Sequence, residues 1–230
     1  MLPNKFFDRD ACDVAKDLLG KMIRVNHGKL FLTVQIIETE AYYKNEKASH
    51  ASLGYTEKRK ALFMKPGTIY MYYARGGDSL NVSCRGAGNA VLIKAAIPLF
   101  GSEDDSSMLK AMHRLNPHPN PSKKREDLRL CSGQTLLCKS LGLRVPDWDQ
   151  QEFDPDRFYL DDSNHVPTSI IQTKRLGIPK GRDDHLLYRF VDSQYAALCT
   201  ENPLRKRAWK VGKDYFMIDR VRKRLCHVSD

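Results

Sequence analysis

The chain has 230 residues, of which 41% are hydrophobic and 29% are charged, and its formal net charge is +10. This composition is typical of a folded protein and excludes a disordered chain. No apolar run reaches the roughly 18 residues of a transmembrane helix, and residues 1–10 lack a signal core, so neither membrane insertion nor secretion is expected.

The first predicted element is a helix over residues 9–20, with Asp10 as its N-cap and Gly20 at its end. Residues 22–25 and 30–40 then predict a β-hairpin that turns at Asn26-His27-Gly28. Residues 43–60 are polar and rich in lysine, and we expect them to be irregular.

The second strand of this hairpin carries an unusual pattern. Its apolar residues alternate from Leu30 to Ile36, and the same parity then places Glu38, Glu40 and Tyr42 on the buried face. A carboxylate in that position must be paired, protonated or used in chemistry. The alternative is a β-bulge that turns both carboxylates outward.

The rest of the chain predicts a mixed arrangement of strands and helices. Residues 69–74, 80–85 and 90–97 read as a β-meander that Pro98 stops, and 157–160 and 187–191 as further strands. Residues 105–115 and 134–141 read as helices, with a proline-rich loop at 116–124. Without an internal repeat or a long linker, the prediction is a single α+β domain, with a curved antiparallel sheet and meander surrounded by helices.

We place this domain at residues 1–200, followed by a basic C-terminal extension at residues 201–230. The extension holds nine basic and four acidic side chains, which gives a net charge of +5. Such a segment could follow phosphates without sequence preference, or it could be a terminal element with ordinary surface charge. The apolar cluster Tyr215-Phe216-Met217-Ile218 indicates that it docks on the domain.

The overall positive charge favours a polyanionic partner, nucleic acid ahead of an anionic membrane, although ordinary surface charge is the alternative. The sequence has no dinucleotide-binding or phosphate-binding glycine loop, no nucleophile elbow and no zincin helix. Its six cysteines form no Cys-x-x-Cys pair. We therefore expect no cofactor and no metal, and chemistry centred on Glu40.

Several short motifs in order resemble the alkyladenine (3-methylpurine) DNA glycosylase family, from about residue 6 to 143 and more faintly to 191. They are Asp17-Leu-Leu-Gly-Lys, Ile36-Ile-Glu-Thr-Glu-Ala-Tyr, Ala48-Ser-His, Phe63-Met-Lys-Pro-Gly-Thr-Ile-Tyr-Met-Tyr, Leu80-Asn-Val, Ala90-Val-Leu-Ile-Lys-Ala and Leu130-Cys-Ser-Gly.

The resemblance implies a monofunctional enzyme that flips a damaged purine out of duplex DNA and hydrolyses its N-glycosidic bond. Glu40 matches the family's general base, which activates water. Tyr42, His50 and Tyr72 match the rings that sandwich the flipped base, and Asn81 matches a residue at the purine edge. Glu38 is left as a structural acid that needs a cationic or hydrogen-bonding partner.

For DNA binding, the resemblance implies contacts from Arg75, Lys94, Lys65, Ser132 and Gly133. Arg75 stands where the family inserts a bulky wedge, typically tyrosine, into the gap left by the base, in a turn that is one residue shorter. Lys94 stands where the family usually has arginine, so its phosphate contact would lack bidentate geometry. Gln134-Thr-Leu replaces the family's Pro-x-Lys, which removes one cation.

Two other readings remain open: a lesion-binding protein with weak or no catalysis, and a basic RNA-binding module on the same scaffold. Under the glycosylase reading, the partner is double-stranded DNA with alkylated or deaminated purines. The protein would bind it as a monomer, without a small-molecule cofactor or a membrane. We expect a cytoplasmic, nucleoid-associated protein if the source is bacterial and a nuclear one if it is eukaryotic.

Overall fold

The longest strand, β2 (Leu30–Tyr42), organises the fold. It forms a hairpin with β1 (Met22–His27) and pairs along most of its length with β5 (Ala90–Pro98). Beyond the hairpin, its last part also pairs with β8 (Arg189–Asp192), so that a C-terminal strand lies beside the predicted carboxylates. The computed structural model describes residues 1–74, 76–101, 103–205 and 208–220.

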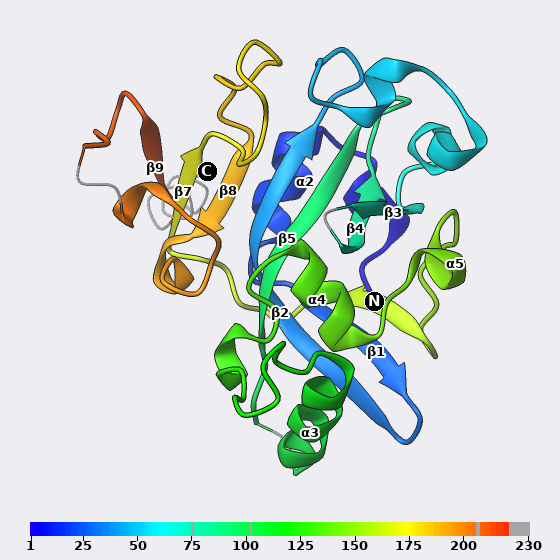
Figure 1. Cartoon of the computed structure of the whole chain (residues 1–230). Coiled ribbons are helices and arrows are strands. Elements are labelled where there is room, and N and C mark those ends of the chain that lie inside the picture. Colours follow the sequence, from blue (N-terminus) through cyan, green and yellow to red (C-terminus); the bar gives the residue numbers. More distant parts are fainter. Residues whose placement is uncertain (75, 102, 206–207, 221–230) are drawn as a thin grey trace, which may run out of the picture.

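Within those ranges, nine antiparallel strands form one sheet in the order β3-β4-β5-β2-β8-β7-β9, with β1 and β6 branching from β2 (Figure 1). The outer strands are β3 (Ile69–Ala74), β4 (Gly77–Ser83), β7 (Ser169–Thr173) and β9 (Tyr215–Asp219), and β6 (Phe158–Asp161) pairs with β1. The predicted meander β3-β4-β5 is confirmed, and its last strand, β5, pairs with β2.

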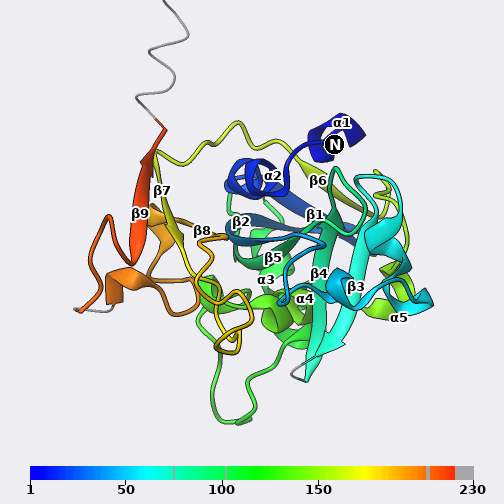
Figure 2. The ribbon, with the colours of Figure 1, turned by 90° about the horizontal axis from the view of Figure 1, so that it is seen from above.

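Two helices cover the central strands from opposite sides. Asp10 caps α2 (Ala11–Leu18) by accepting from the backbone N–H groups of Cys12 and Asp13, as expected. This helix packs on β2, whereas α4 (Gln134–Leu141) lies across β4 and β5 on the other side (Figure 2). The remaining helices are α1 (Asn4–Phe7), α3 (Asp105–Leu115) and α5 (Val145–Trp148).

The α+β class, the antiparallel sheet and the boundaries of α3 and α4 are confirmed. The expectation for residues 43–60 is partly wrong, because two 3₁₀ helices, η1 (His50–Leu53) and η2 (Glu57–Phe63), form there. Strands β7 and β9 were not predicted; β9 is at the sheet edge, where Phe216 and Met217 remain exposed. None of the described helices is long and apolar enough to cross a membrane.

Candidate active site

A β-bulge in β2 decides where its two carboxylates point. The pairing with β5 shifts between Ile36 and Thr39. Before the bulge, Val34 and Ile36 lie in the main core, but beyond it Thr39 donates to the α2 backbone, 2.7 Å from the carbonyl oxygen of Ala15. The alternation is thus reversed, because one extra residue changes the face of every later side chain.

Glu38 and Glu40 therefore face away from α2, opposite to the face that unbroken alternation predicts. The alternative prediction of a bulge is confirmed, but the bulge does not turn the two carboxylates to solvent. Both side chains are 0% exposed, with Thr200 against Glu38 and with Tyr42 and Lys94 against Glu40. Two buried carboxylates two residues apart each need a partner.

Glu38 is held by a structural network. Its Oε1 accepts from Arg189 Nε at 2.7 Å and from the Thr200 hydroxyl at 2.6 Å. Its Oε2 accepts from the Thr200 backbone N–H at 3.0 Å. The expected cationic partner is thus confirmed as Arg189 of β8, which is 1% exposed and completes a fully buried ion pair.

Glu40 has a different environment. Its Oε2 accepts from the Tyr42 hydroxyl at 2.7 Å, and its Oε1 lies 3.3 Å from the Lys94 ammonium. Burial alone would raise the pKa of Glu40, but the charges of Lys94 and Arg189 and the Tyr42 hydrogen bond outweigh it and lower the pKa. Glu40 is therefore an anion at neutral pH.

The contact with Lys94 is an ion pair and not an aligned hydrogen bond. Among the residues that the structure describes, none donates such a bond to Glu40 Oε1. That oxygen keeps a lone pair available for a proton. The partner of the other oxygen is fixed as a donor, because burial and the adjacent carboxylate raise the pKa of Tyr42.

Strand register explains why the predicted pocket residues meet. Tyr70 of β3 pairs with Asn81 of β4, Asn81 with Leu92 of β5, and Leu92 with Glu40 of β2, so one row crosses four strands. Residues two positions along each strand share the same face. Tyr42, Tyr72 and Lys94 therefore point to the same side of the sheet as Glu40.

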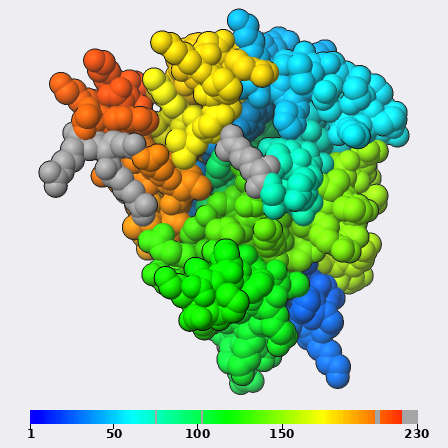
Figure 3. All heavy atoms as spheres, viewed as in Figure 1, coloured from blue at the N-terminus to red at the C-terminus, as the bar shows by residue number. Residues whose placement is uncertain are grey.

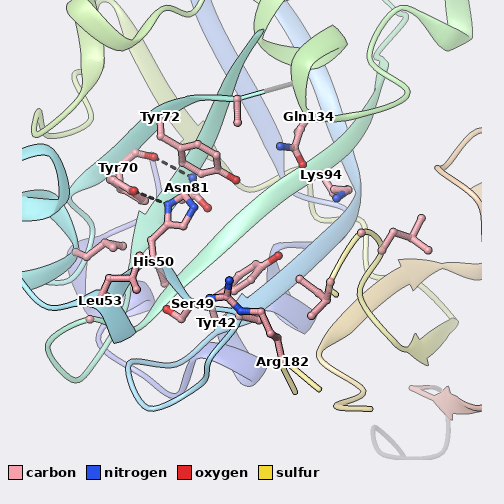
Figure 4. A pocket seen from close by; sticks show the side chains of 18 of the residues that line it. Tyr42, Ser49, His50, Leu53, Tyr70, Tyr72, Asn81, Lys94, Gln134 and Arg182 are labelled. Atoms are coloured by element: carbon pink, nitrogen blue, oxygen red, sulfur yellow. Dashed lines mark hydrogen bonds between the residues drawn. The ribbon is translucent and has the colours of Figure 1, made fainter. Parts of the chain in front are cut away.

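A cavity of about 350 Å³ opens on this face. Figure 3 shows the surface hollowed between the β7–β8 connection and the β3–β4 hairpin. The structure brings five predicted residues together in its lining, from four strands and the start of η1, and Figure 4 shows their side chains around it: Tyr42, His50, Tyr72, Asn81 and Lys94. Glu40 itself is not part of the lining, but it touches Tyr42 and Lys94, which are.

The aromatic rings divide into two groups. The His50 and Tyr72 rings meet edge to face, with centroids 4.5 Å apart, and His50 Nδ1 lies 2.8 Å from the Tyr70 hydroxyl (Figure 4). Burial and then the charges of Arg59 and Arg182 lower the pKa of His50, so its ring is uncharged at neutral pH. Tyr42 comes from a different strand, at the end of β2.

Two amides complete the lining. Asn81 is 4% exposed, and its Nδ2 donates to the Tyr70 carbonyl oxygen at 3.2 Å. Gln134, at the start of α4, donates from Nε2 to the Ser79 hydroxyl at 2.8 Å. The sequence comparison treats Gln134 only as a departure from the family, but in the structure its side chain reaches the cavity.

The wall contributed by the β7–β8 connection was missed, because the resemblance is only faint between residues 143 and 191 and supplied no site residue there. Leu176, Ile178, Pro179 and Arg182 line the cavity. Arg182 donates to the Lys47 carbonyl oxygen, and Asp183 accepts from the Lys47 backbone N–H at 2.7 Å. These contacts join two loops that are more than 100 residues apart in the chain.

Of the other predicted DNA-contacting residues, Lys65, Ser132 and Gly133 lie outside the cavity lining. Lys65 is 2.6 Å from Glu152 in an exposed ion pair, and the Ser132 hydroxyl donates to Leu198 at 2.6 Å. Gly133 precedes α4 with a φ of +130°, a conformation that favours glycine. Arg75 lies outside the described residues. The DNA contacts of these residues stay predictions.

The chemistry of the cavity is that of a carboxylate, a cation, aromatic rings and amides. In the described part of the chain, no three histidine, cysteine, aspartate or glutamate side chains are placed to hold a metal ion. The arrangement suits stacking of a flat heterocycle on the rings, with the Glu40 carboxylate buried behind Tyr42 and Lys94 of the lining.

Comparison with known proteins extends this picture. The family described as "Methylpurine-DNA glycosylase (MPG)" matches residues 5–196. A protein of Pseudomonas aeruginosa (strain UCBPP-PA14) is 60% identical over 217 residues, which is 94% of this chain and 90% of that protein. One from Pseudomonas savastanoi pv. phaseolicola is 59% identical over 218 residues, with 95% and 97% coverage.

A more distant protein, from Rhizobium johnstonii, is 33% identical over 180 residues and covers 78% of this chain and 80% of its own. All three carry the name "Putative 3-methyladenine DNA glycosylase". The family match spans both the cavity and the strands that build it. The chain belongs to the methylpurine-DNA glycosylase family.

Proposed function

We propose that this protein is a monofunctional DNA glycosylase that removes alkylated or deaminated purines, 3-methyladenine among them, from double-stranded DNA. The observation that carries the proposal is the state of Glu40: a buried anion with one oxygen free of aligned donors, directly behind an aromatic cavity. The family match and the names of the relatives support the same activity.

The cavity fits a flipped purine. Its volume of about 350 Å³ is at the lower end of the range for small-molecule sites, roughly 300–1,000 Å³. We propose that the base stacks between Tyr42 and the His50–Tyr72 pair, after extrusion from the duplex. An uncharged His50 adds no repulsion against an alkylated purine that carries positive charge. Asn81 would lie against the edge of the base.

In the proposed reaction, Glu40 accepts a proton from a water molecule while the oxygen of that water bonds to the anomeric carbon. The bond between that carbon and the purine nitrogen breaks, and its electron pair leaves with the purine. The Lys94 ammonium keeps Glu40 ionised and lies close to where the sugar would be. The protonated amine of Lys94 has no lone pair with which to attack the anomeric carbon, which supports water as the nucleophile.

We propose that the enzyme acts as a monomer, needs no cofactor, and works on the nucleoid in the cytoplasm, since its relatives are bacterial. Residues 1–200 would form the glycosylase domain, with residues 201–230 as a basic extension. The described part of that extension includes β9, which pairs with β7.

The test is excision from duplex oligonucleotides that contain 3-methyladenine, 7-methylguanine, hypoxanthine or ethenoadenine. Release of at least one base by the wild type, and loss of release in Glu40→Gln, is the expected result. Glu38→Gln is the matched control, because Glu38 is equally buried on the same strand but serves structure. Retained full activity in Glu40→Gln would contradict the assigned role.

A second candidate is a lesion-binding protein with weak or no catalysis. It is favoured by one observation, that Glu40 itself is 0% exposed and does not line the cavity. Lesion-specific binding by the wild type, with no product over hours, would support it. Equal binding to RNA and to undamaged DNA would instead point to the RNA-binding reading.

A further inference from the structure

A buried arginine lies against the ring of Tyr42. The guanidinium carbon of Arg175 is 4.4 Å from the centroid of the Tyr42 ring and 5.5 Å from that of Tyr188. Arg175 is 4% exposed and does not line the cavity, whereas Tyr42 does. The guanidinium therefore covers Tyr42 from the protein interior and leaves the cavity side of the ring for a ligand.

Two anchors fix this guanidinium relative to the ring. Its Nη1 donates to the carbonyl oxygen of Ala41, the residue before Tyr42, at 2.8 Å. Its Nη2 forms an ion pair with Glu46, which is 6% exposed. Glu46 is held in turn, because its Oε1 accepts from the Tyr43 backbone N–H at 2.8 Å. Arg175 thus ties the β7–β8 wall to the end of β2.

A cation on one face of an aromatic ring changes what the other face binds. The ring attracts cations through its negative face, and a charge that already occupies one face opposes a second charge on the other. A positively charged purine, such as 7-methylguanine in DNA, is therefore disfavoured on this ring. An uncharged purine such as hypoxanthine stacks mainly by dispersion and is much less affected.

Glu46 moderates this effect. Its carboxylate faces the same guanidinium and reduces the positive field that reaches the cavity. Arg175 and Glu46 therefore have opposite effects on the binding of a positively charged base, and each residue can be substituted separately.

We propose that Arg175 is a positioning and specificity-determining residue that holds Tyr42 in place and shifts base selection toward uncharged damaged purines. This inference rests on the proposed function, because it concerns the base that the same cavity accepts. Arg175 touches neither the cavity nor Glu40, and it acts through the Tyr42 ring.

The test measures single-turnover excision of 7-methylguanine and of hypoxanthine from otherwise identical duplexes, and takes the ratio of the two rates. Arg175→Met removes the charge and should raise the ratio of 7-methylguanine to hypoxanthine by roughly threefold or more. Glu46→Gln leaves the arginine uncompensated and should lower the same ratio. Arg175→Lys keeps the charge and should leave the ratio near that of the wild type.

The rate ratio is expected to rise in Arg175→Met and to fall in Glu46→Gln, and these opposite changes distinguish an effect on base selection from an effect on folding. A merely structural role would reduce both rates together in every variant and leave the ratio unchanged, which would overturn the inference. Because both rates come from one protein preparation, partial unfolding cancels in the ratio, and thermal melting records it independently. If the wild type excises neither of these two bases but releases 3-methyladenine or ethenoadenine, the inference is overturned and the proposed function stands. If it releases none of the four bases, the proposed function itself is overturned.

Discussion

The Lys94 ammonium lies 3.3 Å from Glu40 Oε1, and the two residues are 6% and 0% exposed. The two residues are 54 positions apart in the sequence, and they meet because β5 and β2 are neighbours in the sheet. The pair sets the protonation state of the proposed base, since burial and the lysine charge act on it in opposite directions.

Lys94→Met should move the acid limb of the pH–rate profile to higher pH. In the wild type, the pKa of Glu40 is below its ordinary value, so activity falls only at strongly acidic pH. Without the ammonium, the largest effect that opposes burial is lost, so the pKa is higher than in the wild type. Single-turnover excision across pH 4–9 would measure the shift. Lys94→Arg keeps a cation and should keep the limb, and an unmoved limb in Lys94→Met would contradict the assignment.

The free energy of unfolding of Lys94→Met should also differ from that of the wild type in its dependence on pH. A carboxylate with a lowered folded pKa stabilises the protein above its unfolded pKa, and this contribution is lost as pH falls through the folded pKa. In Lys94→Met the folded pKa is lowered less, so a change from pH 7 to a pH below the unfolded pKa should cost that variant less stability than it costs the wild type. Urea unfolding at both pH values measures the difference.

Tyr42→Phe should lower kcat while lesion affinity is largely retained. The ring stays for stacking, but Glu40 Oε2 loses the hydroxyl donor at 2.7 Å. A hydrogen bond to a charged group contributes about 1.5–3 kcal/mol, so a rate loss of roughly 10- to 150-fold is expected. Tyr73→Phe is the matched control, since Tyr73 is 69% exposed. Equal effects of the two substitutions would contradict the prediction.

Arg189→Met should destabilise the fold by about 3–5 kcal/mol, because it leaves the Glu38 carboxylate buried without its cation. Equilibrium urea unfolding measures the loss, and the double variant Glu38→Gln with Arg189→Met should recover part of it. Lys65→Ala breaks an exposed ion pair with Glu152 and should cost about 1 kcal/mol or less. Similar losses at both sites would show that burial does not govern these pairs.

Arg75→Ala should slow base flipping and excision, because a side chain that fills the gap left by the base would be lost. The residue lies outside the described part of the chain, so this prediction rests on the sequence resemblance alone. Fluorescence of 2-aminopurine placed beside the lesion reports flipping. Unchanged fluorescence and excision would exclude a gap-filling role.

Neutralising Arg222, Lys223 and Arg224 together should flatten the dependence of DNA affinity on salt. These three residues also lie outside the described ranges, and their charges come from the sequence. Each phosphate contact contributes about −0.9 to the slope of log affinity against log salt, so loss of up to about three contacts is measurable. A slope equal to that of the wild type would show that this segment does not touch DNA.

The sequence alone predicts what short-range periodicity encodes. The α3 stripe and the meander repeat within a few residues, and the structure confirms both. It does not decide between unbroken alternation and the bulge after Ile36, because no local signal in this stretch favours one over the other. Nor does it predict that Arg189 pairs with Glu38, since that contact spans 151 positions and depends on β8 joining β2.

The candidate site shows the same division. Family resemblance supplied Tyr42, His50, Tyr72, Asn81 and Lys94, which the strand register then collects in one cavity. The β7–β8 wall and the cation behind Tyr42 could not be found in this way, because each depends on loops that meet only after folding.

The bulge in β2 also determines which sequence changes this protein can tolerate. If β2 paired regularly at its present length, without the bulge, both carboxylates would turn into the apolar contact with α2, and a change of one residue in its length would alter its register with β5. An insertion or deletion in this stretch is therefore far more damaging than most substitutions. Related proteins should accept varied apolar residues here, while the number of residues between Leu32 and Glu40 stays constant.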